Sequence, residues 1–62
     1  MRKIMSLPKD PVMLLSVVNT QLRDRYSTLE ELAAANDISV QEIKERLQKI
    51  NYEYNEQLNQ FK

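Results

Sequence analysis

Residues 27–50 place the strongest constraint on the fold, because they hold two helical segments separated by a corner. Asn36 and Asp37 interrupt the apolar pattern, and both tolerate a left-handed backbone better than a helix interior. Directly after them, Ser39 with Glu42 three residues later forms a capping box, which begins a helix. The segment therefore predicts two short helices joined by a tight corner.

The helix before the corner begins at Ser27 or Thr28, since each is followed three residues later by a glutamate, Glu30 or Glu31. Asn51 is a suitable stop for the helix after the corner. Ile38 precedes the second cap and packs on Ile43 as a hydrophobic staple. Apolar residues recur at helical spacing in both segments. The expected buried residues are Leu29, Leu32 and Ala33, then Val40, Ile43, Leu47 and Ile50.

A longer helix precedes this pair. Asp10 followed by Pro11 is a strong helix start, because the carboxylate accepts free amide protons and proline at the first helical position loses no hydrogen bond. The helix is predicted from Pro11 to about Arg25. Its core-facing stripe is Leu14, Leu15, Val18, Leu22 and Tyr26.

Met13 and Val17 lie outside that stripe and form a second apolar patch, with Val12 beside it. One interpretation is that the N-terminal arm or Phe61 covers the patch. The other is that it contacts a protein partner or a second copy in a homodimer, because uncovered apolar surface usually marks contact.

The ends of the chain complete a single domain. Residues 1–9 are predicted to be an N-terminal arm, from which Ile4, Met5 and Leu7 pack on the body, and residues 10–62 the domain itself. After the last helix, Tyr52 and Tyr54 alternate with polar residues, and a polar turn at 55–57 precedes Leu58 and Phe61. We interpret this tail as either a short hairpin or an extended segment folded over the helices. The fold class is therefore mainly α, with three helices and a short C-terminal β-hairpin.

The corner and its flanking helices resemble the helix-turn-helix of bacterial transcription regulators, and the tail resembles a reduced wing. The matching positions are Leu32, Ala33, Ile38, Ser39, Ile43 and Leu47. Two positions depart from the pattern, since Asn36 stands where an apolar residue is usual and Asp37 where glycine usually makes the turn. The resemblance implies a fold more than DNA binding, because tri-helical modules of this shape also serve other functions.

A second resemblance covers nearly the whole chain. The segments that carry it are Pro8 to Ser16, Asn19, Leu22 to Asp24, Tyr52, Tyr54 and Asn59 to Phe61. They are similar to a family of small bacterial proteins filed as a domain of unknown function. That resemblance implies a bacterial cytoplasmic protein and transfers no activity or site.

Composition excludes several function classes. The chain has no Cys, His or Gly, so disulfides, zinc or imidazole sites and glycine-rich phosphate loops are unavailable, and we expect no enzyme, metal or cofactor. No segment reaches the roughly 20 apolar residues of a membrane span. Net charge is zero, but residues 1–25 hold five basic and two acidic side chains (+3) and residues 26–62 hold four and seven (−3).

DNA binding is the alternative to protein interaction. The outward residues of the last helix that would read bases are Gln41, Lys44 and Gln48, whereas Glu45 on the same face would repel phosphate. Glu42 with Arg46 and Glu45 with Lys49 are expected ion pairs of a solvated helix. A binder of nucleic acid normally shows a basic footprint, and these helices lie in the acidic part of the chain. The sequence therefore favours interaction or self-association.

Remaining polar and aromatic residues have structural interpretations. Asn19 and Arg23, four residues apart beside Asp24, form either a polar network at the end of the first helix or part of a contact surface, and we favour the network. Tyr26, Tyr52 and Tyr54 are expected to be half-buried covers of the core, since no basic groove accompanies them. Arg2, Lys3 and Lys9 could steer an acidic partner to the arm.

Overall fold

The computed structural model describes residues 7–62. In chain order the elements are α1 (Pro11–Asp24), α2 (Leu29–Ala35), α3 (Val40–Gln48), β1 (Tyr54–Asn55) and β2 (Gln60–Phe61). The two strands pair antiparallel, with Tyr54 opposite Phe61 and Asn55 opposite Gln60. The predicted fold class, mainly α with three helices and a short C-terminal hairpin, is confirmed.

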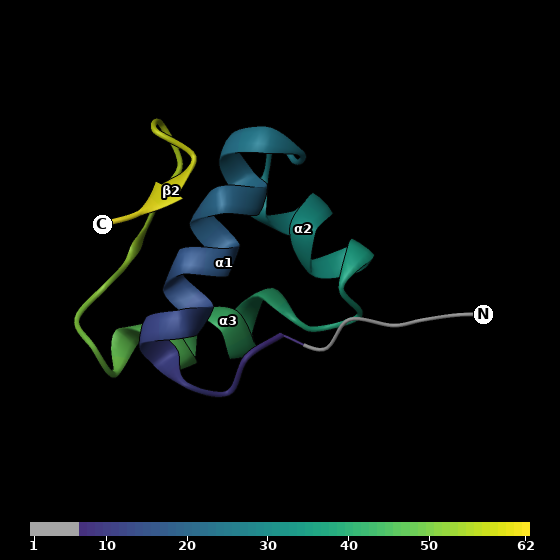
Figure 1. Ribbon diagram of the computed structural model, residues 1–62. Coiled ribbons are helices and arrows are strands. Elements are labelled where there is room, and N and C mark those ends of the chain that lie inside the picture. Colours follow the sequence, from purple (N-terminus) through teal and green to yellow (C-terminus); the bar gives the residue numbers. More distant parts are fainter. Residues whose placement is uncertain (1–6) are drawn as a thin grey trace.

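Helix α1 is the central element. It contacts α2, α3 and β2, and Figure 1 shows the hairpin on one side of α1 and α2 on the other. The core forms where these elements meet. Its buried members are Leu14, Val18 and Leu22 of α1, Leu29, Leu32 and Ala33 of α2, Ile43 and Leu47 of α3, and Phe61 of β2. The predicted core residues Leu15, Tyr26, Val40 and Ile50 pack against this cluster from partly exposed positions.

The three predicted helix starts are confirmed. Asp10 caps α1, and its carboxylate accepts a hydrogen bond from the Val12 amide at 3.3 Å. Thr28 caps α2, and Ser39 caps α3 by accepting from the Glu42 amide at 3.0 Å. Each cap satisfies an amide that has no partner within its helix. Local sequence therefore sets where all three helices begin.

The reciprocal half of each predicted capping box differs. The Glu31 carboxylate accepts from both the amide and the hydroxyl of Ser27 at 3.1 Å, one residue before the cap. The Glu42 carboxylate pairs with Arg46 one turn later. In α3 the charged Arg46 side chain competes with the backbone amide of Ser39 for the Glu42 carboxylate. The carboxylate pairs with Arg46, because a charged hydrogen-bond donor binds it more strongly than a neutral amide does.

Within residues 7–62, three residues hold a left-handed backbone, Asp37 (φ 56°), Asn51 (φ 67°) and Asn59 (φ 53°). The chain has no glycine, and Asn and Asp tolerate this conformation best among the remaining residues. Asp37 forms the predicted corner between α2 and α3, and Asn51 follows the last turn after α3 as predicted. The third position, Asn59, makes the hairpin turn.

The predicted turn at residues 55–57 is wrong by one to two residues. Asn55 belongs to β1, and the turn occupies 56–59. The Asn55 side chain accepts a hydrogen bond from the Leu58 amide at 3.0 Å, which closes the turn from the strand end. The left-handed backbone of Asn59 lets the chain reverse into β2. The alternation of Tyr52 and Tyr54 with polar residues does not predict that the turn ends at Asn59.

The hairpin is fastened to α1 by two asparagines. The Asn19 side chain donates to the Phe61 carbonyl at 3.0 Å and accepts from the Phe61 amide at 2.8 Å, as a neighbouring strand would. Asn59 donates to the carbonyls of Leu22 and Tyr26, at 3.1 and 3.0 Å, at the end of α1. The backbone edge of β2 and two carbonyls at the end of α1 are thereby satisfied.

The expected network of Asn19, Arg23 and Asp24 is therefore only partly right. Arg23 and Asp24 do pair, but Asn19 turns to the backbone of β2, because the amide side chain satisfies both polar groups of Phe61 at once. The three tyrosines are half-buried, as predicted.

The arm is described only from Leu7, which packs against the core as predicted. The predicted contacts of Ile4 and Met5, and the charges of Arg2 and Lys3, lie outside the described residues. Within residues 7–62, no helix combines the length and apolar character that crossing a bilayer requires.

Candidate functional site

The candidate site is the outward face of α1, which we define as Val12, Met13, Ser16, Val17 and Thr20. Val12 and Met13 are 62% and 58% exposed, the highest values among the large apolar residues described. Ser16 and Thr20 are exposed, and Val17 is half-buried. Phe61 does not cover Met13, since it lies in the core. The predicted patch residues Met13 and Val17 lie together on this face.

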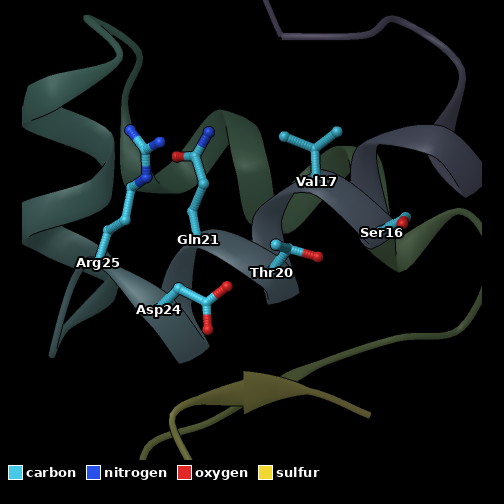
Figure 2. Close-up of a pocket in the computed structure, with 6 residues that line it drawn as sticks. All are labelled: Ser16, Val17, Thr20, Gln21, Asp24 and Arg25. Atoms are coloured by element: carbon cyan, nitrogen blue, oxygen red, sulfur yellow. The ribbon is translucent and has the colours of Figure 1, made fainter.

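A shallow groove of about 340 Å³ runs along the side of this face that borders α2. Figure 2 shows Val17, Gln21 and Arg25 pointing to one side of α1, with Ser16, Thr20 and Asp24 along the adjacent ridge. Gln21 is fixed there, because its carbonyl oxygen accepts from the Asn36 amide group at 2.9 Å. Asn36 also donates to the Leu32 carbonyl, so the corner after α2 holds this wall of the groove.

A second groove of about 400 Å³ borders the hairpin. Its lining residues are Asn19, Thr20, Leu22, Arg23, Leu58, Asn59 and Gln60. Leu58 is 53% exposed at the hairpin turn, although the sequence suggested that it covers the helices. Apolar spacing alone cannot place it, because the turn lifts residue 58 away from the core. Thr20 belongs to both grooves, so the outward face of α1 is a ridge between them.

The C-terminal end of this ridge carries an ion pair. Arg23 donates to both carboxylate oxygens of Asp24, at 2.9 and 3.1 Å. These hydrogen bonds, reinforced by the opposite charges of the two side chains, lower the pKa of Asp24 and raise that of Arg23. Lys9 lies exposed before the N-terminal end of α1. The ridge is thus apolar or small in its middle and charged at its ends.

The candidate DNA-contact residues lie on the exposed side of α3. The structure brings Lys44 and Gln48 together in a groove of about 230 Å³ with Tyr52, Glu53, Tyr54 and Phe61. Gln41 instead donates to Glu45 at 3.2 Å. The expected Glu42–Arg46 pair forms, whereas Glu45 takes Gln41 as its partner rather than Lys49. Much of the polar surface of α3 is therefore used within the helix.

Within residues 7–62, no three acidic side chains gather as they would to hold a metal ion. Both faces present apolar contact, hydrogen bonding and charge, which support noncovalent recognition.

A family model described as "Domain of unknown function (DUF4250)" matches residues 8–61. The chain belongs to this family. The match spans α1, α2, α3 and both strands, so the outward face of α1 and the hairpin lie inside the family domain. The resemblance to a domain of unknown function noted in the sequence is confirmed. Neither a curated protein nor a solved structure matches the chain.

Proposed function

We propose that this DUF4250 domain is a protein-interaction module without catalytic activity, and that its contact surface is the outward face of α1. The observation that supports it most is the exposure of Val12 and Met13, 62% and 58%, on the helix around which the fold is built. Exposed apolar residues that adjoin one another on a folded domain favour contact with a partner.

The physical basis is the burial of apolar area on a rigid support. Removing apolar surface from water contributes about 25 cal/mol per Å². A partner gains this contribution at low entropic cost, because α1 is already held on both flanks, by the Asn19 contact with β2 and by the Gln21 contact with Asn36. The small side chains of Ser16 and Thr20 let a partner backbone approach closely.

The test compares two charge variants that should fold equally well. The tagged 62-residue chain and its Met13→Glu and Lys44→Glu variants are each expressed in the native host, cross-linked to their partners and captured. We expect the wild type and Lys44→Glu to retain the same specific partner, and Met13→Glu to lose it. Circular dichroism checks that all three melt alike, since both positions are exposed. Retention of the partner by Met13→Glu, or its loss from Lys44→Glu, would overturn the assignment of the surface.

The second candidate function is DNA binding by α3 and the hairpin, acting as a helix-turn-helix with a reduced wing. The observation in its favour is the convergence of Lys44 and Gln48 with Tyr52 in one groove. Glu53 lines the same groove and Glu45 lies on the same helix, so the surface lacks the basic footprint that phosphate contacts require.

Fluorescence anisotropy with mixed-sequence duplex DNA at rising salt separates the two functions. DNA binding predicts affinity that falls steeply with salt, and a salt slope that drops by about one unit in Lys44→Ala. The interaction function predicts no salt-dependent binding of the duplex. A steep slope that Lys44→Ala reduces would replace the α1 proposal with the α3 one.

A further inference from the structure

We infer that the partner of the outward face of α1 is a second copy of the same chain, with the two α1 helices packed antiparallel. This inference rests on the proposed function. It comes from the spacing of the residues along α1 and from the charges at its two ends.

The exposed residues form one seam along the helix. Met13, Ser16, Thr20 and Asp24 recur at spacings of three and four residues, which places them along one line on the surface of α1, and Lys9 lies just before its N-terminal end. Met13 and Thr20 are seven residues apart and lie almost above one another. Two copies of a seam of this kind pack lengthwise, with the large Met13 opposite a small residue.

An antiparallel pair brings this seam into register with itself. When the two-fold axis passes between Ser16 and Val17, Met13 of one copy lies over Thr20 of the other. Ser16 and Val17 then lie beside their own counterparts near the axis. Each large side chain meets a smaller one, which permits close packing, and the contact is self-complementary as a two-fold interface requires.

The charges fit the same register. The N-terminal end of α1, with Lys9 and Asp10, comes opposite the other end of the second helix, which carries Arg23, Asp24 and Arg25. Asp24 is ionised beside Arg23, which lowers its pKa, and it also meets the positive N-terminal end of the second α1. A parallel pair would instead place Lys9 beside Lys9 and Asp24 beside Asp24. Like charges in contact disfavour that arrangement.

The contact is small, so the dimer is weak. Helix α1 has 14 residues and is about 21 Å long, which limits the buried area to less than the roughly 1,600 Å² of a standard interface. We expect the dimer to have a dissociation constant in the micromolar range or above. The grooves on either side of the outward face add little to the buried area, apart from the exposed Leu58 at the hairpin turn.

Cysteine cross-linking tests the orientation directly, because the chain has no cysteine of its own. Single variants Ser16→Cys, Met13→Cys and Thr20→Cys are oxidised, and Met13→Cys is also oxidised in mixture with Thr20→Cys. In the antiparallel register two copies of residue 16 are offset by only about 1.5 Å along the axis, whereas two copies of residue 20 are offset by about 10 Å. A disulfide needs Cα atoms within about 7 Å.

We expect covalent dimer from Ser16→Cys and from the mixture, and roughly tenfold less from Met13→Cys or Thr20→Cys alone. The matched control is Gln48→Cys, which is exposed on α3 and should not cross-link. Sedimentation equilibrium of the wild type should show a dimer, and Met13→Glu or Lys9→Glu should weaken its association several-fold.

Two results would overturn the inference. Equal cross-linking of the three α1 variants, or of these and the α3 control, indicates a parallel or random pair. A monomer at every concentration, with no cross-link, shows that the partner is another protein. In that case the proposed function still stands if Met13→Glu loses the captured partner, and it fails with the inference if capture is unchanged.

Discussion

The contacts of Asn59 lead to the most specific stability prediction. This residue combines a left-handed backbone with three side-chain hydrogen bonds: it donates to the carbonyls of Leu22 and Tyr26 and accepts from the Tyr54 hydroxyl at 2.6 Å. Substituting Asn59 by glycine keeps the backbone conformation accessible and removes all three bonds. The variant therefore isolates the side-chain contribution.

The expected loss is large for so small a domain. A hydrogen bond contributes about 1 kcal/mol net, so these three partly buried bonds amount to about 3 kcal/mol. The whole chain of 62 residues is expected to have about 3 to 9 kcal/mol of stability. A change of 1 kcal/mol shifts Tm by roughly 4 to 8 °C in domains of this size. Thermal unfolding followed by circular dichroism should show Asn59→Gly melting roughly 10 to 20 °C below the wild type.

Asn51→Gly is the matched control. Asn51 has the same left-handed conformation, and its exposed side chain makes no hydrogen bond to the described residues. The same substitution there should change stability by less than about 0.5 kcal/mol. Equal effects at the two positions would show that the backbone, rather than the side-chain bonds to α1, decides the stability at Asn59.

Three further predictions concern the core, a cap and a half-buried hydroxyl. Leu47→Ala should cost about 2 to 5 kcal/mol in urea unfolding, because it leaves a cavity where α1 and α3 meet, and an unchanged midpoint would contradict that packing. Ser39→Ala should cost about 1 kcal/mol by the same measurement, while Ser39→Asp should not. Burial raises the pKa of Tyr54, so its stabilising contribution is complete below the ordinary tyrosine pKa and is lost as pH rises through the raised value. Unfolding measured from about pH 8 to about pH 11 should show a steeper decline in the wild type than in Tyr54→Phe, and parallel declines would argue against it.

The helices were predictable because their signals are local. Each cap, Asp10, Thr28 and Ser39, acts on an amide two or three residues away, so the sequence window that contains the residue also contains its partner. The left-handed Asp37 was predictable for the same reason, since Asn or Asp is the remaining choice at a corner without glycine.

The attachment of the hairpin was not predictable from local pattern. Asn19 and Phe61 are 42 residues apart, and Asn59 and Leu22 are 37 apart. At short range the sequence offered Arg23 and Asp24 as partners for Asn19, and the expected network was right only for the Arg23–Asp24 pair. Nothing in the spacing of an asparagine states whether it will pair with a side chain or with the backbone of a distant strand.

The candidate surface was only half predictable. Met13 and Val17 fall outside the core stripe by helical spacing alone, so the sequence identified them. Whether another segment covers them depends on where the tail returns. In the structure Phe61 enters the core and Leu58 stays exposed, so the C-terminal tail does not cover the patch.

The residues of α1 that stabilise the fold are different from those proposed to contact a partner. The core side of α1 packs on α2 and α3, and its two flanks use Asn19 for β2 and Gln21 for Asn36. Both polar side chains form hydrogen bonds inside the fold. The strip of α1 between them presents apolar and small residues, with charged residues at its ends. Replacing Met13 by glutamate then removes apolar contact without disturbing a hydrogen bond, and should leave Tm within a few degrees of the wild type. A large loss of Tm in that variant would mean that the outward face of α1 contributes to folding, and the assignment of a recognition surface would lose its basis.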